Sequence, residues 1–130
     1  MKRTAEIYRS STIYEKRHVC FDEECAHEIL DLMENPKVAQ KLNYIFDRIL
    51  EQRFIYYDDY VKIEDGISEM RIFPNGMNAR IYCKEVKSEE GDFFVIAAKL
   101  LPKKKSRKIN KEIQQLIDPI KKYEYTVNKH

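Results

Sequence analysis

Apolar side chains recur between positions 38 and 50 with the period of an α-helix and form one uninterrupted stripe. The stripe consists of Val38, Leu42, Ile45, Phe46, Ile49 and Leu50. Asn35 is a suitable N-cap for this helix, and Pro36 has the fixed φ angle that suits its first position. A helix with one apolar face buries that face against another layer of structure, so the fold needs at least two layers.

The segments before this helix are predicted to be strand and then helix. Residues 4–21 alternate loosely between apolar and charged side chains, which predicts one or two strands with an interruption near positions 10–11. From Asp22 the pattern changes to helical period, with Asp22 itself as a suitable N-cap. The apolar row of this first helix is Cys25, Ile29 and Met33.

The segments after the stripe are predicted to be strands. Residues 54–66 are predicted to be a connecting loop with some strand, and runs at 68–73, 78–86 and 92–101 have strand composition with turn residues between them. The last run is apolar on both faces, as in a central strand. In the run before it, alternation predicts that Ala79, Ile81 and Cys83 face the core and that Arg80, Tyr82 and Lys84 face outwards.

A further helical period covers residues 106–121, and residues 123–127 form either a frayed end or a final strand. The stripe of this helix is Ile109, Ile113, Leu116, Ile117 and Ile120. We therefore predict one α+β domain over residues 1–130. It has an N-terminal strand and two helices, then a three- to four-stranded antiparallel sheet and a basic C-terminal helix, with the helices in one layer on one face of the sheet.

Several protein classes are excluded by the sequence. No run approaches 18 apolar residues and the N-terminus lacks the apolar stretch of a signal peptide, so we expect a cytoplasmic protein with no membrane association. The three cysteines and three histidines lack the clustered spacing of a zinc site. We therefore expect no metal and no other cofactor, with Cys25 and Cys83 as small core residues.

Charge is distributed unevenly along the chain. Residues 1–98 contain 14 Lys/Arg and 19 Asp/Glu, whereas residues 99–130 contain 10 Lys/Arg and only 3 Asp/Glu. The basic residues are concentrated in the run Lys103-Lys104-Lys105-Ser106-Arg107-Lys108. This run is either a phosphate-binding surface or the solvated start of a helix. Because the helix dipole disfavours cations at an N-terminus, phosphate binding is the preferred interpretation.

Three motifs carry a family resemblance. Ile67-Ser68-Glu69-Met70-Arg71-Ile72 is similar to a strand written g-l-y-E-L-R, and Ala79-Arg80-Ile81-Tyr82 is similar to y-R-i-f. The segment from Val95 through Leu101-Pro102-Lys103-Lys104 to Ile113 is similar to i-v-L-L-h-g-F-x-K-K-t-x-K-t-P-x-x-E-I. In this order the motifs resemble the RelE/HigB superfamily of toxins from type II toxin–antitoxin systems, in particular its HigB-like, phage-derived branch. The resemblance covers roughly residues 22–121.

The resemblance implies a RelE-like fold and a ribosome-dependent endoribonuclease that cuts mRNA and inhibits translation. It implies a metal-independent reaction in which the ribose 2′-OH attacks the phosphorus, so the site has to move protons and stabilise the phosphorane. The implied partners are mRNA, the ribosome and a cognate antitoxin, commonly a helix-turn-helix protein.

Candidate catalytic residues lie within the motifs. If Arg71 and Arg80 emerge on one face of the sheet, their guanidinium groups can clamp one phosphate; the alternative is that they are ordinary exposed cations. Clustered cations lower one another's proton affinity, which makes Lys104 a candidate general base. Tyr82 beside Arg80 is a candidate for stacking a base or assisting proton transfer.

The candidate RNA-binding residues are Lys99, Lys103, Lys105, Arg107 and Lys108. Tyr123 and Tyr125 in the tail are further functional candidates, although a packing role is equally compatible with tyrosine. The acidic aromatic segment 56–60 either contributes to a protein interface or lies as a loop over the core.

The sequence also departs from the family pattern. Lys99 stands where the family has histidine, Leu101 where it has an aromatic residue, and Lys108-Ile109 where it has Thr-Pro. These changes keep or add positive charge, which preserves affinity for RNA. They put in doubt any proton transfer that depends on the family histidine. Two alternatives therefore stay open: a toxin-fold interaction protein without RNase activity, as in ParE-like gyrase inhibitors, and a basic nucleic-acid-binding module unrelated to toxins.

Overall fold

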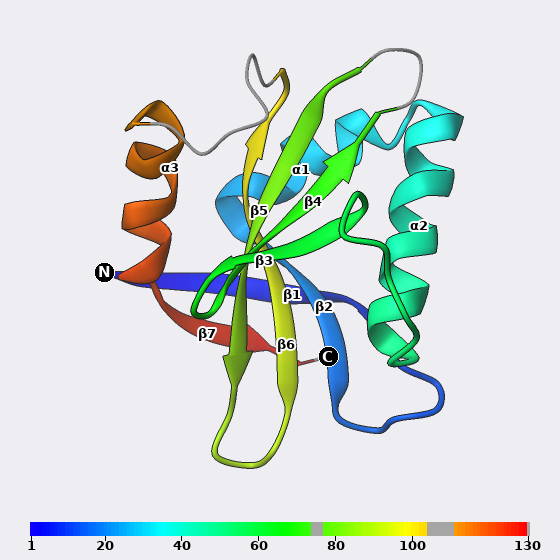
Figure 1. Ribbon diagram of the computed structural model, residues 1–130. Coiled ribbons are helices and arrows are strands. Elements are labelled where there is room, and N and C mark those ends of the chain that lie inside the picture. The colour runs from blue at the N-terminus through cyan, green and yellow to red at the C-terminus, as the bar shows by residue number, and fades with distance from the viewer. Residues whose placement is uncertain (74–76, 104–110, 130) are drawn as a thin grey trace.

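A computed structural model describes residues 1–73, 77–103 and 111–129 of the chain (Figure 1). Within these residues the elements are β1 (Lys2–Ser10), β2 (Arg17–Asp22), α1 (Glu23–Leu32), α2 (Pro36–Leu50), β3 (Tyr60–Glu64), β4 (Ile67–Ile72), β5 (Ala79–Lys87), β6 (Phe93–Leu101), α3 (Lys111–Lys121) and β7 (Glu124–Asn128). The predicted caps of the first two helices are confirmed. An Asp22 side-chain oxygen accepts from the backbone N–H of Glu24 at 2.8 Å, and Asn35 accepts from that of Lys37 at 3.0 Å.

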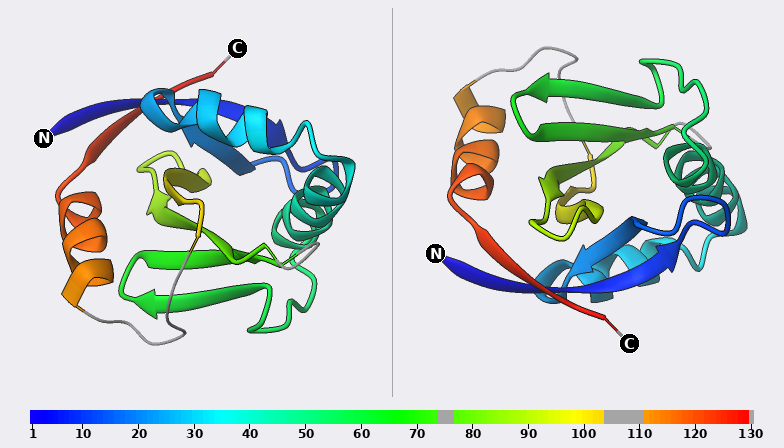
Figure 2. Two further views of the ribbon diagram at one scale, coloured as in Figure 1. Left: turned by 90° about the horizontal axis from the view of Figure 1, so that it is seen from above. Right: turned by 90° about the horizontal axis from the view of Figure 1, so that it is seen from below.

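The strands of the described chain join in one mixed sheet with the order β3-β4-β5-β6-β2-β1-β7. Strands β3 to β6 are antiparallel neighbours and β1 is antiparallel to β2, whereas β2–β6 and β1–β7 are parallel pairs. Strand β6 lies at the centre, as its apolar composition predicts. The sheet is strongly twisted, so that its two edges face each other with α2 and α3 at the sides (Figure 2).

This sheet corrects the predicted RelE-like fold class, in which three to four antiparallel strands form the sheet. The described chain has a seven-stranded mixed sheet instead. Strand β2 pairs with β6, from which it is separated in sequence by α1, α2 and three strands. Strand β7 pairs with β1, at the opposite end of the chain. Parallel pairs of this kind join segments far apart in sequence, and periodicity within each segment carries no information about them.

The prediction of helices on one face is also wrong, because α2 and α3 lie on opposite sides of the sheet (Figure 2). A large core between the sheet and helices α1 and α2 includes Cys25, Ile29, Leu42, Phe46, Met70, Ile81 and Cys83. A second core under α3 consists of Ile67, Tyr82, Ala98, Ile113, Ile117 and Ile120. Because α3 covers this second face, Tyr82 is buried; Arg80, which lies against Phe73 and Glu69, is buried as well, so neither side chain projects into solvent as predicted.

A buried polar network fixes one end of the sheet. His18 is 8% exposed, stacks on Phe94 and lies with Nε2 2.9 Å from an Asp92 carboxylate oxygen. Its Nδ1 lies 2.8 Å from the Ser10 hydroxyl. The Lys129 ammonium donates to the other Asp92 oxygen at 2.7 Å. The network therefore connects β1, β2 and the β5–β6 turn with the end of β7.

We expect the contribution of Asp92 to stability to disappear in acid. Hydrogen bonds from Lys129 and His18 lower the pKa of Asp92 to about 2, whereas an aspartate in an unfolded chain has a pKa of about 3.9. The carboxylate therefore stabilises the fold above about pH 4, and this stabilisation is lost as the pH falls through about 2. The urea midpoint of the wild type should exceed that of Asp92→Asn at neutral pH and approach it near pH 2. Two parallel pH profiles would contradict this expectation.

Candidate functional site

Arg71 and Arg80 occupy directly opposite positions on the antiparallel strands β4 and β5. Their neighbours Met70, Ile72 and Ile81 point into the core under α2, so period-two alternation turns both arginines to the other face of the sheet. The same-face placement anticipated from the sequence is thus present. Arg71 retains 21% exposure of its side chain, whereas Arg80 retains 2%.

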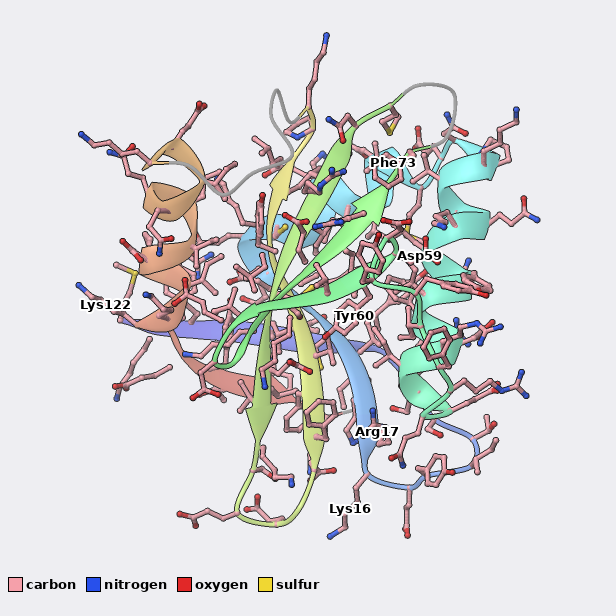
Figure 3. All side chains as sticks on the ribbon, viewed as in Figure 1. Lys16, Arg17, Asp59, Tyr60, Phe73 and Lys122 are labelled. Carbon is pink, nitrogen blue, oxygen red and sulfur yellow. The ribbon has the colours of Figure 1, made fainter. Side chains whose placement is uncertain are left out.

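The two guanidinium groups line one cavity of about 290 Å³ together with Asp58 and Phe73. The guanidinium carbon of Arg80 lies 4.7 Å from the centroid of the Phe73 ring, in cation–π geometry. Phe73 is 42% exposed and lies level with the first turns of α2, on the same side of the picture as Asp59 (Figure 3). Neither Asp58 nor Phe73 was anticipated as part of a site, because they come from a loop and a strand end whose positions depend on the tertiary fold.

Glu69 connects the two arginines and is 1% exposed. One of its carboxylate oxygens accepts from Arg71 Nε at 2.7 Å and lies 3.4 Å from Arg80 Nε. The carboxylate orients both guanidinium groups and neutralises one of the two positive charges. Sequence reasoning missed this role, although Glu69 stands two residues before Arg71 and strand alternation places both on the same face.

Tyr82 differs from its predicted role. It is fully buried in the core under α3, so its ring is not available to stack on a base. Burial and the neighbouring Glu69 carboxylate raise the pKa of the Tyr82 phenol well above its ordinary value. The phenol therefore stays protonated at neutral pH and is no general base.

The candidate RNA-binding lysines are described only in part. Lys99 is exposed on β6, opposite Tyr82 in the strand register, and Lys103 is exposed just after the end of β6. The other candidates lie outside the described residues, namely Lys104, Lys105, Arg107 and Lys108. Lys99 therefore lies on the same face of the sheet as Arg71 and Arg80, and the three cations come from three adjacent strands. The acidic side chains near them are Glu69 and Asp58.

The tail tyrosines have structural contacts. The Tyr125 hydroxyl donates to the buried Asp22 carboxylate at 2.6 Å, and the Arg3 guanidinium carbon lies 4.4 Å from the Tyr123 ring centroid. The pKa of Tyr125 is raised by burial and by its hydrogen bond to Asp22. Both residues belong to the junction of β1 and β7, so the packing interpretation describes them better than a functional one.

The cavity suits one phosphate with a base beside it. A pair of guanidinium groups on neighbouring strands can donate several hydrogen bonds to phosphate oxygens, and the partly exposed Phe73 places an aromatic ring beside them. Because the Arg71 side chain is 21% exposed whereas Arg80 is 2% exposed and has Phe73 against its guanidinium, Arg71 is the more accessible of the two cations to an incoming anion.

Comparison with known proteins gives no match among family models, curated proteins or solved structures. Across the part of the chain that the structure describes, no helix is long and apolar enough to cross a membrane.

Proposed function

We propose that this chain is the toxin of a type II toxin–antitoxin module, a ribosome-dependent endoribonuclease that cuts mRNA in the cytoplasm and so inhibits translation. The proposal depends on one observation: Arg71 and Arg80 stand opposite each other on β4 and β5 and line one cavity with Phe73. The motif resemblance to RelE/HigB toxins supports it, and that resemblance also suggests a helix-turn-helix antitoxin as the inhibitory partner.

The proposed reaction needs no metal. The ribose 2′-oxygen attacks the phosphorus and the bond from phosphorus to the 5′-oxygen breaks, which leaves a 2′,3′-cyclic phosphate and a 5′-hydroxyl. A base takes the 2′-proton and an acid returns a proton to the leaving oxygen. Arg71, backed by Arg80, would stabilise the charge on the phosphorane. Lys104 remains the proposed base, and Lys99 is the cation that β6 contributes to this face.

A second candidate is an interaction protein without RNase activity, which acts by binding alone. Two observations favour it: Glu69 already accepts from the Arg71 guanidinium, and Lys99 stands at the histidine position of the family motif. A site of this composition holds a phosphate without moving a proton. In this alternative the arginine cavity would anchor a nucleic acid or an acidic segment of a target protein.

Induced expression in a bacterial host separates the two functions. Growth arrest with new mRNA 5′ ends inside translated frames is expected for the endoribonuclease. Arg71→Ala should reduce the cleavage rate about 10- to 100-fold, because it removes a charge-assisted contact to the phosphate. Lys62→Ala is the matched control, since Lys62 is an exposed cation on β3 of the same sheet.

The outcomes differ for each function. Arrest with intact mRNA would support the binding alternative and contradict cleavage. Normal growth with soluble protein and intact mRNA would contradict both. Equal cleavage by Arg71→Ala and Lys62→Ala would contradict the assignment of the site while leaving the activity established.

A further inference from the structure

Large aromatic side chains gather on the surface beside the arginine cavity, along α2 and the segment that follows it. We call this surface the aromatic ledge; it consists of Tyr44, Phe54, Tyr56 and Tyr57. Their exposed fractions are 37%, 71%, 61% and 69%, respectively. Ile55, between two of them, packs against the core, so alternation along this segment turns its neighbours outwards. The outward direction of Phe54 and Tyr56 in the ledge therefore follows from the local backbone conformation.

Contacts within the ledge hold the rings in place. Phe54 and Tyr56 meet edge to face with centroids 5.1 Å apart. The Arg48 guanidinium donates to the Phe54 carbonyl at 2.7 Å, and its carbon lies 4.8 Å from the Tyr44 ring centroid. Rings that are already ordered lose little conformational entropy when a partner stacks on them.

Positive charge accompanies the rings. A depression of about 490 Å³ on α2 is lined by Lys37, Gln40, Lys41 and Tyr44. The Lys41 ammonium lies 5.7 Å from the Tyr44 ring centroid, on the side away from the C-terminal end of α2. Aromatic rings interleaved with cations are the pattern by which proteins hold single-stranded nucleic acid, since bases stack and phosphates pair.

The ledge is continuous with the arginine cavity. The segment between α2 and β3 runs back alongside α2 towards the end of β4 (Figure 1). Asp58, the residue after Tyr57, lines the cavity, and the backbone N–H of Arg71 donates to the Asp59 carbonyl at 2.9 Å. The Lys41 side chain pairs with the Asp59 carboxylate and so ties this segment to α2. A strand whose phosphate occupies the cavity therefore has the ledge directly beside it.

We propose that the aromatic ledge binds the bases of a single-stranded RNA that continues from the Arg71–Arg80 cavity along α2. This inference rests on the proposed function and names the path of its substrate. The ledge adds stacking without base-edge hydrogen bonds, so its contribution to affinity is largely independent of sequence.

Binding of labelled single-stranded RNA, followed by fluorescence anisotropy, tests the ledge. The probes are a dinucleotide, whose single phosphate can occupy the cavity alone, and an oligonucleotide of about 12 nucleotides, which also reaches the ledge. The double variant Phe54→Ala/Tyr56→Ala should raise the Kd for the longer RNA at least about tenfold and leave the Kd for the dinucleotide unchanged. The salt dependence of binding should also be unchanged, because no phosphate contact is removed.

Two control variants make the result specific. Leu30→Ala removes another exposed apolar side chain, on α1, and should bind both RNAs as the wild type does. Arg71→Ala should weaken binding of both lengths. Unchanged urea midpoints show that the variants are folded.

Unchanged binding of the longer RNA by the ledge variant would overturn the ledge and leave the proposed function standing. Failure of the wild type to bind either RNA would overturn both. Retained RNA binding together with loss of a protein partner would identify the ledge as a protein-docking surface and would also overturn the inference.

Discussion

Glu69→Ala is expected to lower the free energy of unfolding by about 3–5 kcal/mol, the range measured when one member of a buried ion pair is removed. Glu69 is 1% exposed, and its carboxylate lies within 3.4 Å of both the Arg71 and Arg80 guanidinium nitrogens. Without it, the nearly inaccessible Arg80 loses its compensating charge and faces a second cation at the opposite position of the neighbouring strand. Urea denaturation at neutral pH measures the loss.

A double variant distinguishes loss of charge pairing from loss of packing. Glu69→Leu/Arg80→Leu removes both buried charges and replaces them with apolar volume, so it should recover a large part of the stability lost in Glu69→Leu. If the double variant is as unstable as the sum of the two single variants, Glu69 and Arg80 are not energetically coupled. Glu69 would then stabilise the strand through packing alone.

Local elements of the fold are predicted well from sequence because their signals are local. The stripe from Val38 to Leu50 forms α2, and the caps Asp22 and Asn35 have the expected hydrogen bonds. The same holds for the hairpin loop before β6, where Gly91 has a φ of 91° that a glycine adopts without strain. In each case the determinant lies within a few residues of the element it specifies.

The architecture is not predicted, because it depends on distant pairings. Strand β6 is apolar on both faces, which indicates burial but does not say which strand lies beside it. It pairs in parallel with β2, and helices α1 and α2 lie between the two strands in the sequence. The stripe of Ile113, Ile117 and Ile120 likewise shows that α3 buries a face, and only the tertiary structure shows that this face is the one opposite α2.

The candidate site shows the same division. Period-two alternation and a short turn are enough to predict that Arg71 and Arg80 share a face. Their exposure could not be predicted in this way. Alternation turns Arg80 and Tyr82 away from the core under α2, but Tyr82 is buried in a second core under α3, and Arg80 is buried against Phe73 and Glu69. Phe73 and Asp58 line the cavity because the loop before β3 returns to the end of β4. That return has no signature in the sequence.

The sequence predicts either a frayed end or a strand for residues 123–127, and the structure has strand β7 there. The attachment of β7 to the rest of the fold involves one buried carboxylate, that of Asp22. The Asp22 carboxylate is 1% exposed and caps α1 through the Glu24 N–H. It also accepts from Arg3 Nε of β1 at 3.0 Å and from the Tyr125 hydroxyl of β7 at 2.6 Å. A single side chain on β2 thus joins both partners of the parallel β1–β7 pair to the first helix.

Asp22→Ala is therefore expected to cost about 3–5 kcal/mol of unfolding free energy, since it removes a helix cap and leaves buried polar groups without their acceptor. Tyr125→Phe removes only one of these hydrogen bonds and should cost about 1 kcal/mol. Asp22→Asn keeps one acceptor oxygen, which can retain the cap, but places an amide NH2 where Arg3 and Tyr125 donate, so its stability should lie between those of the other two variants. Urea denaturation measures all three, and amide hydrogen exchange should show the loss of protection in Asp22→Ala concentrated in β1 and β7. Equal stability of Asp22→Ala and Tyr125→Phe would mean that the carboxylate acts only through Tyr125, and that β7 is held to β1 by its backbone ladder alone.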